Sequence, residues 1–164
     1  MQYSARADGR DIDAALREAL ETLVRELGLE LVELDVFRGK SRCAMAQIRA
    51  IVYKPGALGT DDCSKVHRAI LPRLELAFPG YDLSVEVSTP GIARQVKDGV
   101  ELALYRGRGV RLWRTDISDW SAGLLEAADE QGITIKVKEG TIRLDYAIVA
   151  KARLDPLQEG NIGH

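Results

Sequence analysis

The spacing of apolar residues changes at Pro90-Gly91, and this change limits the chain to folds with two differently built parts. Before it, helical spacing and strand-like alternation take turns over long segments. After it, the apolar segments are short and recur about every ten residues. Pro90 and Gly91 also stop the alternation of Val85 and Val87, so they end a strand. A chain of 164 residues can hold two small domains. The sequence therefore predicts a first domain at residues 1–88, a linker at 89–95 and a second domain at 96–164.

The first part has the pattern helix, strand, strand, helix, strand. Apolar residues recur at helical spacing from Asp11 to Leu27, with Asp11 as the expected N-cap and Gly28 as the expected left-handed residue after the helix. Three alternating segments are the expected strands: LELVELDVF, CAMAQIRAIVY and YDLSVEV. GKSR is the expected turn between the first two strands. This order predicts an α+β sandwich of one small sheet and two helices.

The second helix of this part follows the loop KPGALG. Thr60 is its expected N-cap, and Asp61 and Asp62 lie in the first turn, where negative charge favours the helix dipole. Pro72 interrupts the helical pattern. Because its ring clashes with the carbonyl four residues back, we expect a kink or an end near Leu71.

The part after the break predicts a small β-barrel. A short helix is expected around Gly99 to Tyr105, and five short segments follow: GVRLWR, SAGLLEAA, ITIKV, TIRLDY and VAKARL. Asp145–Ile148 has the pattern of one tight turn before the last strand, and small SH3-like and Sm-like barrels close in this way; this step rests on an analogy of folds. The expected fold is α+β, an N-terminal α-β-β-α-β sandwich followed by a small SH3-like or Sm-like barrel.

Basic residues concentrate at the entrance to the second domain. The formal net charge of the chain is −2, but residues 89–114 hold six basic and two acidic residues, six minus two, or +4. Such a block forms a phosphate-facing patch or a set of solvated surface strands, and charge alone does not decide between them. Guanidinium groups suit phosphate through bidentate hydrogen bonds. The expected binding residues are Arg94, Arg106, Arg108, Arg111 and Arg114.

Trp113 and Trp120 lie in the same basic region. Aromatic rings among arginines can stack nucleic-acid bases. We favour the simpler interpretation, in which Trp113 covers the mouth of the barrel and Trp120 packs on a neighbouring strand.

Cys63 and His67 are four residues apart on the second predicted helix and could act as nucleophile and base. Cys63 also lies on the apolar stripe, which favours a buried structural thiol, and no third group orients the pair. Cys43 and Cys63 form no C-x-x-C motif, and the histidines are His67 and His164. Glycine-rich phosphate loops are absent from the sequence. We therefore expect no enzyme, no cofactor and no metal.

The N-terminal segment MQYSARADGR has no apolar core of a signal peptide, and no run of 18 apolar residues exists in the sequence. We expect a soluble cytoplasmic protein with reduced thiols.

Four segments resemble one family. VEVSTPGIAR is similar to the strand-to-linker signature S-S-P-G-hydrophobic-D-R-P of the ribosome maturation factor RimP family, and YKPGALGTDDCSKVHRAI to its K-P-G…T-x-D-D-C…V-S-R segment. LELVELDV resembles its first strand and IVAKARLDP its last. The resemblance spans nearly the whole chain. It implies a cytoplasmic bacterial protein that assists assembly of the small (30S) ribosomal subunit, and we expect this protein to be a monomer. Such a protein binds rRNA and a small-subunit ribosomal protein, without covalent chemistry.

The linker departs from the family signature. Ala93 and Gln95 stand where the family usually has Asp and Pro, while Arg94 is kept, which predicts a looser linker. Two other functions stay open. A general RNA-binding or translation-linked Sm-like module would bind free single-stranded RNA as tightly as the subunit. An enzyme would lose activity, but not stability, on Cys63→Ser.

Overall fold

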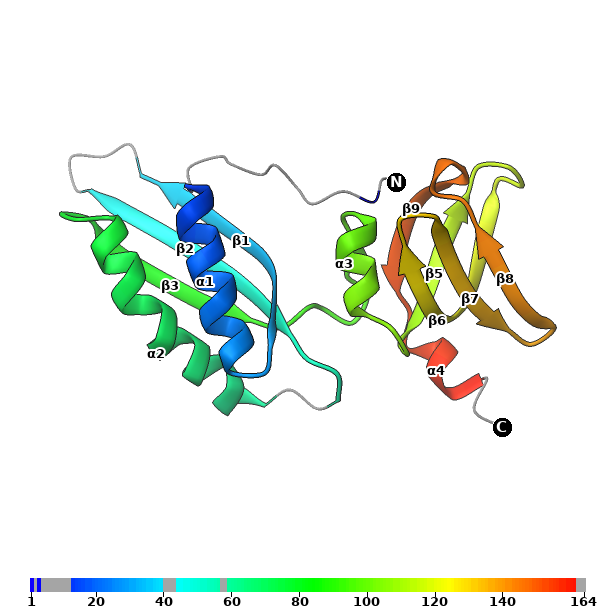
Figure 1. Ribbon diagram of the computed structural model, residues 1–164, viewed down its shortest axis with the longest axis horizontal. Coiled ribbons are helices and arrows are strands. Elements are labelled where there is room, and N and C mark those ends of the chain that lie inside the picture. Colours follow the sequence, from blue (N-terminus) through cyan, green and yellow to red (C-terminus); the bar gives the residue numbers. More distant parts are fainter. Residues whose placement is uncertain (2, 4–12, 40–43, 57–58, 162–164) are drawn as a thin grey trace. The chain divides into compact units, whose positions relative to one another are not determined.

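The computed structural model describes residues 1, 3, 13–39, 44–56 and 59–161 (Figure 1). The chain divides into two compact units. The first unit is Asp8–Pro90, and the second unit is Gly91–His164 together with Met1–Ala7. Within the described residues, no helix is long and apolar enough to cross a membrane.

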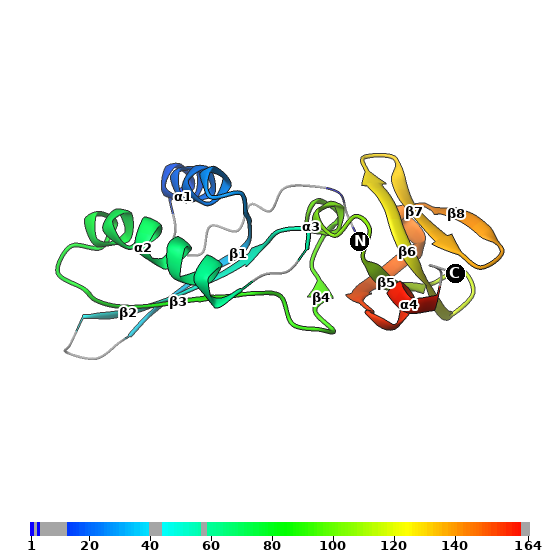
Figure 2. The ribbon, with the colours of Figure 1, turned by 90° about the horizontal axis from the view of Figure 1, so that it is seen from below.

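The first unit has the predicted α-β-β-α-β order. Its elements are α1 (Ala14–Glu26), β1 (Glu30–Arg38), β2 (Met45–Tyr53), α2 (Thr60–Ala77) and β3 (Asp82–Ser88). The strands form one sheet in the order β1-β2-β3, with β1 antiparallel and β3 parallel to β2. A parallel pair needs a long connection, and α2 supplies it. Both helices lie on the same face of the sheet (Figure 2).

The core of the first unit lies between that face and the helices. Ile48, Ala50 and Val52 of β2 have no exposed surface, as the alternation of the sequence predicts. Leu20 and Val24 of α1 pack into the same cluster. The α2 residues of this cluster recur at helical spacing: Val66, Ile70 and Leu74.

The ends of α1 follow from local hydrogen bonds. Asp13, and not the predicted Asp11, is the N-cap, and its carboxylate accepts from the backbone N–H of Ala15. Asp11 lies outside the described residues, as does most of the predicted GKSR turn. Gly28 has a φ of 82°, so the predicted left-handed residue after the helix is confirmed.

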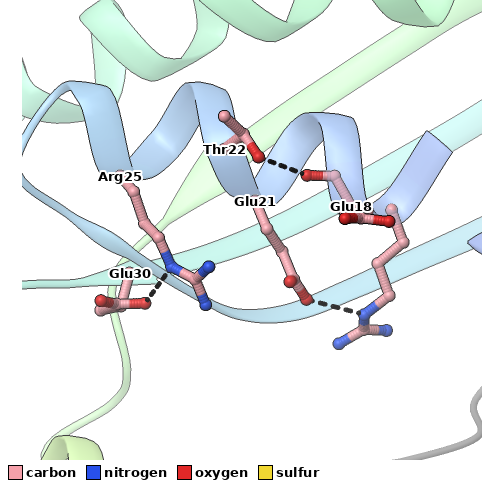
Figure 3. Close-up of polar contacts among 6 residues, drawn as sticks. Glu18, Glu21, Thr22, Arg25 and Glu30 are labelled. Atoms are coloured by element: carbon pink, nitrogen blue, oxygen red, sulfur yellow. Dashed lines mark hydrogen bonds and ion pairs between the residues drawn. The ribbon is translucent and has the colours of Figure 1, made fainter. Parts of the chain in front are cut away.

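The solvent face of α1 carries polar contacts. Arg25 reaches Glu30 of β1 at 3.2 Å, and the hydroxyl of Thr22 donates to the carbonyl of Glu18 (Figure 3). Exposed contacts of this kind contribute little to stability.

Helix α2 differs from the prediction at two places. Gly59 is its N-cap instead of Thr60, because the Asp62 carboxylate accepts from the backbone N–H of Gly59. The helix also continues through Pro72 to Ala77, so of the two predicted outcomes, a kink or an end near Leu71, the end is wrong. Pro72 and Arg68, whose carbonyl loses its helical donor, are both exposed, so water can satisfy that carbonyl. Burial of the apolar face keeps the helix intact beyond the proline.

The second unit contains the predicted short helix, the five strands and the tight turn. It also contains a two-residue strand and a C-terminal helix that the sequence did not predict. The elements are β4 (Gln95–Val96), α3 (Gly99–Leu104), β5 (Gly109–Arg114), β6 (Asp119–Asp129), β7 (Gly132–Val137), β8 (Gly140–Leu144), the 3₁₀ turn η1 (Tyr146–Ile148), β9 (Val149–Leu154) and α4 (Leu157–Asn161).

The six strands form one antiparallel sheet in the order β4-β9-β5-β6-β7-β8. Strands β4 and β8 are its two edges, and over the described residues no ladder joins them. The turn η1 sends β9 to pair with β5 instead of β8 (Figure 1). Closure of this sheet into a barrel is therefore not confirmed.

Two residues from the start of the chain belong to the second unit. The α-amino group of Met1 donates to the carbonyl of Val149 at 2.7 Å. The ring of Tyr3 lies against that of Tyr146, with centroids 5.8 Å apart. The core of the second unit is thus covered at η1 by residues far away in sequence.

Candidate nucleic-acid interface

Buried and partly exposed side chains alternate along β5, so the sheet of the second unit has two different faces. Val110 and Leu112 are completely buried and point to the core. Arg111 and Trp113 alternate with them along β5, so they occupy the opposite, outer face. The sequence GVRLWR therefore places one cation and one indole side by side on the outside.

The outer face continues onto both neighbouring strands. On β6, Trp120 is directly opposite Trp113. On β9, Lys151 is opposite Trp113 and Arg153 is opposite Arg111. We call these five residues, Arg111, Trp113, Trp120, Lys151 and Arg153, the Arg–Trp face.

The two indoles of the Arg–Trp face pack edge to face. Their centroids are 5.4 Å apart and their planes make an angle of 73°. This is a favourable geometry for an aromatic pair. The prediction that Trp120 packs on a neighbouring strand is confirmed. The prediction that Trp113 covers a barrel mouth is wrong, because the register of β5 points Trp113 outward beside Trp120.

Two guanidinium groups converge on one of these rings. The Cζ atom of Arg111 lies 5.6 Å from the centroid of Trp120, and that of Arg153 lies 5.8 Å from it. Both distances are within the range of a cation–π interaction. Trp120 thus holds two like charges close together, which creates a locally positive potential.

Among the described residues, one carboxylate forms an ion pair with a cation of this face. Asp155, just after β9, pairs with Arg111 at 3.3 Å, while the Arg111 side chain keeps 41% of its surface exposed. Lys151 and Arg153 are exposed. Asp155 also accepts from the side chain of Gln158 on α4. Within the second unit, the Arg–Trp face therefore exposes cations and aromatic surface to solvent.

The other predicted arginines lie elsewhere on the second unit. Arg108 pairs with Glu159 of α4 at 2.6 Å, and Arg114 with Asp116 in the β5–β6 turn at 2.6 Å. Burial raises the pKa of Glu159, but hydrogen bonds from Arg108 and Gly109 outweigh it and lower the pKa. Arg106 is exposed in the turn before β5. The five predicted arginines thus do not form one cluster.

Arg94 has a different environment from the others. Its side chain is 11% exposed and its Nε lies 2.5 Å from Oε1 of Glu101. Glu101 also accepts from the hydroxyl of Tyr105 and the backbone N–H of Lys97. Burial opposes the charge on Arg94, yet Glu101 outweighs it and raises the pKa of the guanidinium. These contacts attach the last residues of the predicted linker to the second unit.

Cys63 and His67 line one surface pocket of the first unit with Ser64, Arg68 and Val87. Burial, and then the charge of Asp62, raise the pKa of the Cys63 thiol. A catalytic thiol needs the opposite shift, because the thiolate is the nucleophile. The environment of Cys63 thus favours the structural thiol that its place on the apolar stripe predicts.

Comparison with known proteins identifies the family. The model of the RimP N-terminal domain matches residues 19–93, which includes most of the first unit and the break at Pro90-Gly91. A ribosome maturation factor RimP of Borrelia turicatae is 31% identical over 135 residues, which is 82% of this chain and 90% of that protein. The chain belongs to the RimP family. A RimP protein of Borrelia hermsii is 27% identical over 82% of this chain and 90% of its own length. A RimP protein of Borrelia recurrentis is 29% identical over 78% of this chain and 85% of its own length.

The sequence did not indicate a role for three residues of the second unit: Glu101, Lys151 and Arg153. The alternation in VAKARL does place Lys151 and Arg153 on one face of the last strand. No sequence signal places that strand beside Arg111, because the pairing joins residues far apart along the chain.

Proposed function

We propose that this protein is a ribosome maturation factor that assists assembly of the small (30S) ribosomal subunit. The observation that carries the proposal is the similarity to proteins named ribosome maturation factor RimP over 82% of the chain. The aligned segment of 135 residues is longer than either compact unit, so it includes residues of both units. The partners would be the rRNA of the immature subunit and one of its ribosomal proteins.

The second unit is the part that we propose to contact rRNA. Arg111, Lys151 and Arg153 give its sheet a positive outer face, and cations that neutralise phosphates supply much of the affinity for RNA. Arg106, Arg108 and Arg114 extend the set of basic side chains toward the ends of β5. Arg94 acts differently in this proposal. Because it is buried against Glu101, it positions the start of the second unit and does not itself reach RNA.

We propose that the protein acts by binding alone, in the cytoplasm. The raised pKa of the Cys63 thiol supports this, because Cys63 and His67 are the nucleophile–base pair that the sequence suggests. If Cys63→Ser lowers stability and leaves the assembly activity intact, the structural role is supported. Loss of activity at unchanged stability would support an enzyme instead.

The domain boundaries and the fold of the second domain are also proposals. We propose the two predicted domains, residues 1–88 and 96–164 joined by residues 89–95, with Met1 and Tyr3 packed on the second domain, and an SH3-like barrel fold for the second. Five antiparallel strands with a 3₁₀ turn before the last support this fold. Amide hydrogen exchange tests the barrel fold. Closure of the barrel would protect the outward-facing amides of β8 from exchange, whereas an open edge would let them exchange rapidly.

Co-sedimentation of the full chain with small subunits over a salt series tests the function. We expect binding at low salt that weakens steeply as the salt concentration rises. Immature subunits should bind more tightly than mature ones. A general RNA-binding module would bind free single-stranded RNA as tightly as the subunit in competition. Absence of binding to small subunits at low salt would overturn the proposal.

A further inference from the structure

We propose that the Arg–Trp face binds an unpaired nucleotide of single-stranded RNA, with Trp120 stacking the base and Arg153 and Lys151 contacting the adjoining phosphates. This inference rests on the proposed function and specifies the ligand of the second unit. It starts from the meeting of two guanidinium groups at one indole ring.

The chemistry of the face fits a nucleotide better than an anion alone. A site for phosphate needs cations only, whereas this face adds the half-buried indoles of Trp113 and Trp120. Every base has a π-face that can stack on such a ring, irrespective of sequence. Arginine groups that lie over an indole keep their N–H donors in the guanidinium plane, where they can bind phosphate bidentately. The two guanidinium groups cover part of the Trp120 ring, so a base stacks on this ring when a guanidinium moves from it to the adjoining phosphate.

The register of the strands places a small side chain next to Trp120 on the outer face. Arg111 is opposite Ala122 on β6, so the next outward position along β6 from Trp120 carries only a methyl group. One step further on β6, Leu124 faces Lys136 of β7, which is exposed. A strand of RNA laid across the face would therefore meet cations on β9 and β7 with the indoles between them.

The ligand must be single-stranded for this stacking. In an A-form duplex the bases are paired and stacked on each other, and proteins reach mainly the phosphates and 2′-hydroxyls. A duplex could bind the cations of this face but could not bring a base to Trp120. Single-stranded and duplex RNA of equal phosphate number therefore separate the proposal from simple charge attraction.

The two tryptophans make the test direct, because Trp113 and Trp120 are the only ones in the chain. The full chain is titrated with a single-stranded oligouridine, a duplex RNA and an inorganic polyphosphate of matched phosphate number, while tryptophan emission is recorded. We expect oligouridine to quench the emission and to bind about tenfold more tightly than the other two, since stacking of one base contributes about 1–3 kcal/mol. Equal binding of all three without quenching would overturn the inference.

Substitutions identify the residues that bind oligouridine. We expect Trp120→Leu to weaken oligouridine binding about tenfold. Arg153→Gln should weaken it and reduce the slope of log affinity against log salt by about one. Arg143→Gln is the matched control, since Arg143 is an exposed arginine of β8 in the same sheet, outside the Arg–Trp face. Because Arg153 is exposed, its variant should fold even if Trp120→Leu does not. Wild-type affinity in Arg153→Gln would contradict the inference.

Failure of this inference is distinguishable from failure of the proposed function. If wild type sediments with small subunits, but Trp120→Leu and Arg153→Gln do so equally well, the function stands and the nucleotide site is wrong. If wild type binds oligouridine and not the subunit, the nucleotide site stands and the proposed function is wrong.

Discussion

Arg94 and Glu101 form an ion pair that closes the start of the second unit, with side chains only 11% and 5% exposed. Removal of one partner leaves a buried charge without compensation. We expect Arg94→Met or Glu101→Leu to lower the free energy of unfolding of the second unit by about 3–5 kcal/mol. Denaturant unfolding followed by tryptophan emission measures this unit, because both tryptophans lie in it.

The double variant Arg94→Met with Glu101→Leu is the control for this pair. Because it removes both charges, it should be more stable than either single variant. A loss below about 1 kcal/mol in both single variants would contradict the role that we assign to the pair.

Tyr146 carries a buried hydroxyl without a hydrogen-bond partner among the described residues. An unsatisfied buried hydroxyl is unfavourable, so its removal is favourable or neutral. We expect Tyr146→Phe to leave the second unit as stable as wild type or up to about 1 kcal/mol more stable. A clear loss in the same unfolding experiment would show that the hydroxyl has a partner that we have missed.

High pH should weaken the second unit through its buried tyrosines. Burial, then the charge of Glu101, raise the pKa of Tyr105 well above its ordinary value, and burial raises the pKa of Tyr146 to about 12. The unfolded chain releases these protons near pH 10, whereas the folded chain keeps them. The stability that they contribute is therefore complete below pH 10 and is lost as the pH rises toward 12.

The measurement is the free energy of unfolding of wild type and Tyr105→Phe between about pH 8 and 11. Wild type should lose stability more steeply than the variant above about pH 10, because phenylalanine does not ionise. Parallel curves for the two proteins would contradict the raised pKa of Tyr105.

Pro72 lies inside α2 and deprives the Arg68 carbonyl of its helical donor. Pro72→Ala restores that hydrogen bond, and we expect the first unit to gain about 1–3 kcal/mol in the free energy of unfolding. Circular dichroism during denaturation measures the helices, and Arg73→Ala, at an exposed neighbouring position, is the matched control. A less stable Pro72→Ala protein would mean that the helix depends on the proline.

Local patterns in the sequence were sufficient for most of the elements. The alternation of Ile48, Ala50 and Val52 and the break at Pro90-Gly91 depend on residues close together in the chain, so strands and helices could be predicted there. The continuation of α2 past Pro72 could not, because packing of its apolar face outweighs the local preference of proline.

The candidate site was predicted only in part, for a topological reason. Charge and residue type identified Arg111 and Trp120 as notable, but their proximity to Arg153 depends on β9 pairing with β5. Likewise, the sequence could not tell that Arg94 has Glu101 as its partner and lies buried. Four of the five predicted arginines, namely Arg94, Arg108, Arg111 and Arg114, have a carboxylate partner, which residue type alone does not reveal.

Depletion of the protein in the organism that encodes it tests the central proposal most directly. Ribosomal particles are separated by sucrose gradient, and their rRNA is examined for unprocessed ends. We expect immature small subunits to accumulate while large subunits mature normally. Wild-type protein should restore the profile, and the Arg111→Gln/Arg153→Gln variant should restore it poorly. An unchanged ribosome profile after depletion would contradict a role in maturation of the small subunit.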